Sequence, residues 1–261
     1  CSVMSMKYLG STLDIHGGGA DLVFPHHENE IAQSEAYSGQ PFVRYWLHNG
    51  FITVNKEKMS KSLGNFFIVR DILQKYSGNV VRLYLLSTHY RSPLDFDDSK
   101  LEEAERALER IKNSWQLLQE ALREPASADS TPRDEELSRE LETLRAEFIM
   151  AMDDDFNTAL AISHIFGVVR AVNRYLAEAK DRSKSALEHA MQIFSEMIEI
   201  IGIDLDAEEE KQASLSKVWD IVLSLVEFRN QARKEKDYRT GDLVRDLLAR
   251  QGVILEDSKE G

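Results

Sequence analysis

The sequence predicts a mixed fold in which an α/β part precedes an all-α part. Residues 1–100 contain eight of the thirteen glycines, three of the five prolines and five of the seven histidines. Such a composition is typical of a segment whose backbone turns sharply and approaches ligands closely. From Leu101 onward, apolar residues recur every three or four positions, which is the spacing of amphipathic helices. We therefore expect an active-site domain followed by a helical scaffold.

Charge separates the same two parts. Residues 1–100 carry equal numbers of basic and acidic side chains, so residues 101–261 hold the whole formal charge of −13. An acidic surface argues against a broad nucleic-acid interface, although local basic patches are compatible with a negative total.

Composition indicates a soluble globular protein of one or two domains. Of the 261 residues, 43% are apolar and 30% are charged. No apolar run approaches the roughly 20 residues of a membrane-spanning helix. The only cysteine is Cys1, which excludes a disulfide framework, and no basic-then-apolar leader is seen. We expect a cytoplasmic protein with no membrane partner.

The elements of the first part follow from local signals. β-rich runs at 11–15 and 51–54 flank a helical stretch at 25–37, and this order indicates an α/β sheet. Pro25 suits the first position of the helix, and two glutamates follow where the helix dipole favours negative charge. Residues 66–100 contain a mixed apolar run with one helix and are interpreted as a connecting region.

The second part is predicted to be a bundle of four helices followed by a smaller domain. The expected bundle helices span 101–122, 137–152, 157–178 and 185–201. Pro125 and Pro132 mark an exposed loop after the first of them. Beyond the bundle we expect, in order, an acidic linker at 204–210, helical chain at 215–251 and a short strand at 253–255.

Three side chains of the first part have the chemistry of a zinc site. His26 and Glu30 are four residues apart and share one face of the predicted helix, and Cys1 adds a thiolate. Imidazole, carboxylate and thiolate are the ordinary protein ligands of zinc. The spacing of His26 and Glu30 has an alternative interpretation, because such a pair is also common on the solvent-exposed face of a helix that binds no metal. His27 points about 100° away from His26, so we expect it behind the ligands or at the surface.

Two further motifs fit the binding of anions. Glycines 17–19 stand between His16 and Asp21, where we expect a strand-to-helix turn whose amides approach a ligand. A flexible turn without a ligand is the alternative. The pentapeptide KMSKS at 58–62 places two lysines three residues apart beside hydroxyl groups. That arrangement suits a loop that closes over phosphates, and a solvated basic loop is its alternative.

The pentapeptide at 58–62 resembles the second signature of the class I aminoacyl-tRNA synthetases. In order and over essentially its whole length, the chain is similar to the cysteinyl-tRNA synthetases of that class. The similar segments are CSVM at 1–4, DIHGGGADLVFPHHENEIAQSEA at 14–36, MDDDFNTALAI at 152–162 and DYRTGDLVRDLLARQGVILEDSKEG at 237–261. The family's HIGH motif is absent from this sequence, and His16 is not part of such a motif. We therefore expect the chain to be the C-terminal part of a longer enzyme and to be inactive alone.

The resemblance implies an architecture and an activity. The implied parts are the C-terminal half of a Rossmann-like class I catalytic domain at 1–65, a stem-contact-like connecting region at 66–100, a helical bundle at 101–204 and an anticodon-binding domain at 205–261. The implied activity is that of a monomeric cysteine–tRNA ligase. It would join cysteine to ATP, accompanied by magnesium, as cysteinyl-adenylate and then transfer the cysteinyl group to tRNA.

The resemblance also implies roles for individual residues. Cys1, His26 and Glu30 would be zinc ligands, and the zinc would bind the thiolate of the substrate and so reject serine, whose hydroxyl is a harder ligand. His16 and Asp21 would line the amino-acid pocket. ATP would be bound by the whole KMSKS motif, with its two lysines stabilising charge on the phosphates: Lys58, Met59, Ser60, Lys61 and Ser62.

A basic cluster near the C-terminus would contact the tRNA. Its members are Arg229, Arg233, Lys234, Lys236 and Arg239. Phosphate contacts by such residues position an RNA, while base contacts specify it; a solvated basic face is the alternative. Two other functions stay open. One is a related ATP-dependent cysteine ligase that makes a low-molecular-weight thiol, and the other is a non-catalytic module that binds tRNA or zinc.

Overall fold

The computed structural model describes residues 1–54, 57–58, 68–124, 130–179, 181–205, 222–235, 237–250 and 253. The chain forms two compact units, Cys1–Ile203 and Asp204–Gly261. Among the described residues, no helix combines the length and the apolar character that crossing a membrane requires.

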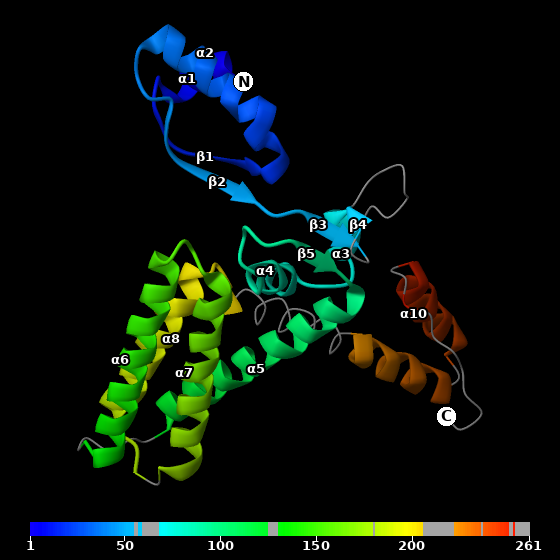
Figure 1. Ribbon diagram of the computed structural model, residues 1–261. Coiled ribbons are helices and arrows are strands. Elements are labelled where there is room, and N and C mark those ends of the chain that lie inside the picture. Colours follow the sequence, from blue (N-terminus) through cyan, green and yellow to red (C-terminus); the bar gives the residue numbers. More distant parts are fainter. Residues whose placement is uncertain are drawn as a thin grey trace. The chain divides into compact units, whose positions relative to one another are not determined.

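Two parallel strands form the base of the N-terminal part. β1 (Leu13–Gly19) pairs with β2 (Val43–Asn49). The chain between them forms a 3-10 turn, a π-helical turn and a regular helix, which are η1 (Ala20–Leu22), η2 (Val23–His27) and α2 (Glu28–Ser38). The first helix, α1 (Ser2–Leu9), contacts α2, and both lie on the same side of the strands (Figure 1).

This part differs from the sequence expectation in three places. Gly17–Gly19 are not a turn but the end of β1, paired with Leu47–Asn49. β2 itself was not predicted. The regular helix begins at Glu28 rather than at Pro25, because Val23–His27 form the π-helical turn η2 instead. Within this turn Phe24 has extended angles (φ −133°, ψ 133°), which a following proline favours.

A small sheet connects the N-terminal part to the bundle. Its strands are β3 (Ile52–Val54), β4 (Glu57–Lys58) and β5 (Leu94–Phe96), in the order β4-β3-β5. β3 is antiparallel to β4 and parallel to β5. Two helices, α3 (Val69–Ile72) and α4 (Gly78–Leu86), precede β5. The expectation of one helix was wrong, because Ser77 starts a new one by accepting a hydrogen bond from the Val80 amide at 3.3 Å.

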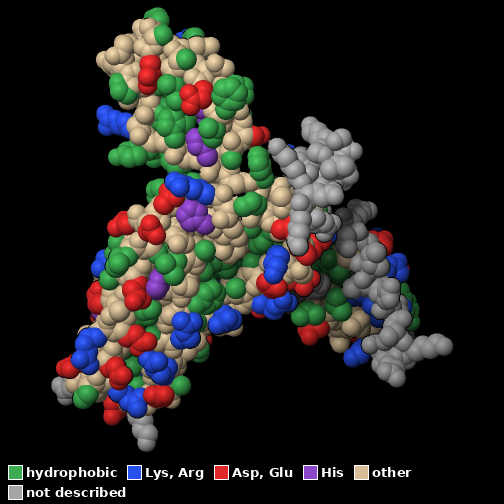
Figure 2. Space-filling model, in the orientation of Figure 1, with side chains coloured by type: hydrophobic (Ala, Val, Ile, Leu, Met, Phe, Trp, Pro, Cys, Tyr) green, Lys and Arg blue, Asp and Glu red, His purple; other side chains and the backbone are tan. Residues whose placement is uncertain are grey.

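The expected bundle of four helices is present in the described part of the chain. Its members are α5 (Asp98–Arg123), α6 (Pro132–Asp153), α7 (Thr158–Glu178) and α8 (Lys184–Ile200) (Figure 1). Each begins at a side chain that accepts a backbone N–H bond, namely Asp97, Thr131, Asn157 and Ser183. The apolar stripe of α5 is buried, while basic and acidic side chains alternate over the bundle surface in Figure 2.

The C-terminal unit contains a pair of helices in its described residues. Residues 222–234 are helical and α10 (Tyr238–Arg250) follows. The continuous helical stretch expected at 215–251 is interrupted because Asp237 caps α10, accepting a bond from the Thr240 amide at 3.1 Å. Most of the expected acidic linker, and all of the expected strand except Val253, lie outside the described residues.

A buried carboxylate fastens the start of α6 to α7. Asp134 is 2% exposed, accepts a 2.7 Å hydrogen bond from the Thr131 amide and accepts another from the Tyr175 hydroxyl. Burial acts to raise the pKa of Asp134, but the bonds from Tyr175, Thr131 and Ser183 outweigh it and hold that pKa below its ordinary value. Burial and the hydrogen bond to Asp134 raise the pKa of Tyr175.

We expect Asp134→Asn to lower the free energy of unfolding at pH 7 by about 1–3 kcal/mol, since an amide cannot accept the same charged network. A depressed pKa stabilises the fold above the unfolded value near ~3.9 and loses that contribution as the pH falls below it. The difference between variant and wild type should therefore shrink in urea unfolding at low pH. Glu135→Gln, at an exposed neighbouring carboxylate, is the control, and equal losses in both variants would contradict the assignment.

Candidate metal centre and active site

Glu30 is the central residue of the candidate site. It lies in the first turn of α2 and is 4% exposed. Its Oε2 is 2.8 Å from His16 Nε2 and 3.9 Å from His26 Nε2. Its Oε1 is buried and has no hydrogen-bond partner among the residues that the structure describes. A buried carboxylate oxygen without a partner is costly, so this atom points to a ligand that completes the site.

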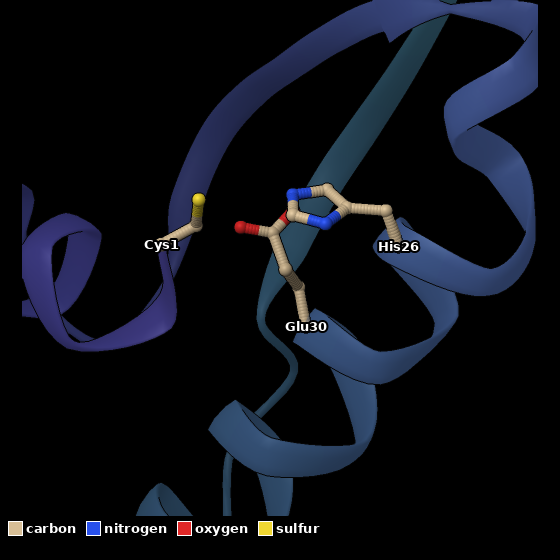
Figure 3. Close-up of side chains that lie close together, drawn as sticks. All are labelled: Cys1, His26 and Glu30. Atoms are coloured by element: carbon tan, nitrogen blue, oxygen red, sulfur yellow. The ribbon is translucent and has the colours of Figure 1, made fainter.

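The structure brings together the three side chains that the sequence singled out. One donor atom each from Cys1, His26 and Glu30 lies within 4.8 Å of the others, and Figure 3 shows these groups pointing toward one another. His26 and Glu30 face the same way because they are four residues apart across the junction of η2 and α2. Cys1 directly precedes α1, which contacts α2. Sulfur, nitrogen and oxygen donors at this separation fit a zinc ion.

A cluster of histidine and tryptophan rings packs beside this donor set. His27 is 3% exposed, and its Nδ1 lies 2.8 Å from His48 Nε2. Burial, followed by the neighbouring His16 and His48, lowers the pKa of His27. His27 is therefore buried beside the candidate ligand His26, and the surface alternative for His27 was wrong. His16, His27 and Glu30 also have donor atoms within 4.8 Å of one another.

Sequence reasoning missed two members of this cluster. His48 stacks on Trp46, with the ring planes 3° apart, and Trp46 also packs against the ring of His16. Both residues lie on β2, two positions apart and therefore on one face of the strand. That alternation was the available signal, but it required β2 to be recognised first.

The glycines of β1 allow the rings to approach the strand. A Cβ atom at Gly18 would lie 2.8 Å from Cε1 of His27, and one at Gly19 would lie 2.5 Å from Oδ1 of Asp21. Asp21 itself is exposed in η1, immediately after the strand. The chain between His16 and Asp21, two residues that the resemblance assigns to the amino-acid pocket, therefore has almost no side chains.

The other predicted site residues are described only in part. Lys58 ends β4 with its backbone opposite Thr53, while Met59, Ser60, Lys61 and Ser62 lie outside the described residues. In the C-terminal cluster, Arg233, Lys234 and Arg239 are exposed, and Lys236 lies outside the described residues. Arg229 differs from the expectation, because it is only 5% exposed and packs within the helix pair.

We expect Gly18→Ala to lower the free energy of unfolding by about 1–3 kcal/mol, because the added methyl group overlaps the His27 ring. Urea unfolding measures the loss. Gly78→Ala is the matched control, since a Cβ there meets no atom within 4 Å and alanine favours the helix that begins at this position. Similar destabilisation by both substitutions would show that close packing at Gly18 is not the cause.

Comparison with known families gives two matches in chain order. Residues 1–106 match the tRNA synthetases class I (C) catalytic domain, and residues 147–206 match the DALR domain. The second match runs from the end of α6 through α8 and stops where the C-terminal unit begins.

Curated relatives agree with these matches. The chain is 51% identical to the cysteine–tRNA ligase of Pelotomaculum thermopropionicum, over 100% of the chain and 56% of that protein. It is also 51% identical to that of Carboxydothermus hydrogenoformans, over 100% of the chain and 54% of that protein. The chain thus spans little more than half the length of these relatives.

A solved structure supports the fold. The LeuRS of Agrobacterium radiobacter K84, in a ternary complex with tRNA and LeuAMS, superposes with a TM-score of 0.57 at 21% identity. The similarity covers 73% of this chain and 27% of the LeuRS chain. With a catalytic-domain match, a DALR match and about half of all residues identical to cysteine–tRNA ligases, the chain is similar over its whole length to part of the cysteinyl-tRNA synthetases of class I.

Proposed function

We propose that this chain supplies the cysteine-binding and tRNA-binding part of a cysteine–tRNA ligase. The observation that carries the proposal is the convergence of Cys1, His26 and Glu30 beside an unpartnered buried carboxylate oxygen. A metal ion can discriminate cysteine from serine, because a thiol is deprotonated and bound by the metal far more readily than a hydroxyl group is. The site therefore fits an enzyme whose substrate is cysteine.

A zinc ion held by these three residues would bind the thiol of the substrate and lower its pKa. His16 keeps the Glu30 carboxylate in place through its 2.8 Å contact, and the buried His27, held by the half-buried His48, packs beside His16. Asp21, which lies exposed directly after the same strand, would pair with the substrate ammonium. These groups orient the cysteine so that its carboxylate is free to attack the α-phosphate of ATP.

The remaining roles concern ATP and tRNA. The two lysines of KMSKS, Lys58 and Lys61, would stabilise charge on the phosphates as pyrophosphate leaves, and magnesium would accompany the nucleotide. The cysteinyl group would then pass to the terminal adenosine of the tRNA. Because the tetrapeptide HIGH does not occur among the 261 residues, we expect this chain alone to bind zinc and tRNA without forming cysteinyl-adenylate.

Two observations weigh against the other functions. A ligase that makes a small thiol has no use for a tRNA-binding domain, whereas residues 147–206 match the DALR domain. A non-catalytic module would describe the chain by itself, since it spans 56% of a curated relative. It leaves unexplained the 51% identity to cysteine–tRNA ligases over the whole chain, so we favour the ligase.

We expect one zinc ion per chain, and Glu30→Gln should weaken its binding by at least about tenfold, the lower bound seen even for residues that only support ligands. Competition with a chromophoric chelator measures the affinity. Glu28→Gln is the control, because that carboxylate lies exposed in the same helical turn. In the cobalt-substituted chain, added cysteine but not serine should produce a thiolate-to-metal absorption band. Zinc affinity unchanged by Glu30→Gln, or no band with cysteine, would refute the site.

We expect weak, salt-sensitive tRNA binding that depends on the exposed part of the basic cluster. Replacing Arg233 and Lys234 with Ala should reduce the slope of log affinity against log salt by about one for each removed phosphate contact. Filter binding at several salt concentrations measures this. The paired substitution of Arg106 and Arg139, both exposed on the bundle, removes the same charge as a control. If both pairs had the same effect, net charge rather than the cluster would determine binding.

A further inference from the structure

The turn between α6 and α7 has an unfavourable backbone that calls for an explanation. Asp155 and Phe156 both have left-handed angles, with φ of 56° and 54°, although neither is glycine. The turn is closed by bonds from the Phe156 amide to the Met152 carbonyl at 3.1 Å and from the Asn157 amide to the Ala151 carbonyl at 3.0 Å. Such strain persists only where surrounding contacts impose it.

Those contacts come from the connecting region. The Tyr90 hydroxyl donates to Asp155 Oδ1 at 2.8 Å, and Arg91 Nε lies 2.9 Å from Asp155 Oδ2. Arg91 Nε also donates to the Tyr90 hydroxyl at 3.0 Å, so the three groups form one network. His89 Nε2 lies 3.7 Å from the same carboxylate. The left-handed turn therefore aims Asp155 at three consecutive residues that precede β5.

The same stretch is bound on its other side to the start of β3. The Gly50 amide donates to the Tyr90 carbonyl at 2.7 Å, and the Leu94 amide donates to the Phe51 carbonyl at 2.9 Å. A side chain at residue 50 would not fit, since a Cβ there would lie 2.3 Å from the Ser92 carbonyl oxygen. Residues 90–94 are thus held from two directions.

The path continues to the strand that carries Lys58. β5 pairs with β3, and the Thr53 hydroxyl donates to Asp95 Oδ1 at 2.7 Å. On its other edge, Thr53 lies opposite Lys58 of β4. A second fastening joins the bundle to the connecting region, because the Thr158 hydroxyl donates to the Leu86 carbonyl at 2.8 Å.

We propose that Asp155 is a positioning residue for the adenylation step: through Tyr90 and Arg91 it fixes β5 and β3, and thereby the strand that places Lys58. The bundle then contributes to the active site without touching a substrate. The role in adenylation rests on the proposed function, whereas the chain of contacts from Asp155 to β5 and β3 does not.

Two variants test the connection in the 261-residue chain. Asp155→Asn keeps the size of the side chain and tolerates the left-handed angles but loses the ion pair, and Tyr90→Phe loses only the hydroxyl. Each should raise hydrogen exchange of the Gly50 and Leu94 amides by about tenfold, as expected for one lost charged hydrogen bond. Amides in the cores of α7 and α8 should change by less than about twofold. Asp154→Asn, at the exposed neighbouring carboxylate, should change neither set.

Unchanged exchange at Gly50 and Leu94 would overturn the connection, and a uniform rise across the chain would show a merely structural role. The second measurement uses a longer polypeptide that contains all 261 residues of this chain and has the full length of the cysteine–tRNA ligase relatives. There Asp155→Asn should lower kcat for cysteine-dependent pyrophosphate exchange about tenfold and leave the KM for cysteine unchanged. A normal kcat together with increased amide exchange would overturn the positioning role alone. An inactive wild type would instead refute the proposed function.

Discussion

The candidate site depends on one buried charge, the carboxylate of Glu30. Placing a carboxylate at 4% exposure is unfavourable unless it is paired or neutralised. The surrounding chain provides this in three ways: His16 contacts Oε2 at 2.8 Å, the first turn of α2 offers its positive dipole end, and donor atoms of Cys1 and His26 lie within 4.8 Å of a carboxylate oxygen of Glu30. The glycines of β1 and the packed imidazoles serve the same carboxylate, because strand residues without side chains let the histidine rings approach it closely.

Different forces stabilise the two ends of the first unit. The bundle has a continuous apolar core, with Leu108, Ile111 and Leu141 at most 1% exposed, and this burial accounts for its stability. In the N-terminal part, α1 leaves Val3, Met4, Tyr8 and Leu9 largely exposed. Parallel strand pairing and polar networks therefore carry more of its structure. Such networks fix geometry more sharply than apolar packing does, which suits a site that must discriminate between ligands.

The sequence predicted what is encoded locally. The four bundle helices were found because each carries its own apolar period and a capping residue, and the pairing of His26 with Glu30 was found because both lie on one helical turn. β2 and its residues Trp46 and His48 were missed, since their role depends on a strand 30 positions earlier in register. The glycines at 17–19 were interpreted as a turn because a strand without side chains shows no alternation.

Parallel pairing also has a consequence for the order of folding. β3 pairs with β5 across about forty residues of intervening chain, whereas α6 and α7 are joined by the short turn at 154–157. Closing a long loop is slow compared with joining neighbouring helices. The helix pair of α6 and α7 can therefore form early, whereas the sheet that joins β3 to β5 can form only after distant parts of the chain have met. The short turn at 154–157 thus belongs to an early-forming part of the fold, and the sheet, whose strand β5 follows the residues that Asp155 contacts, belongs to a late one.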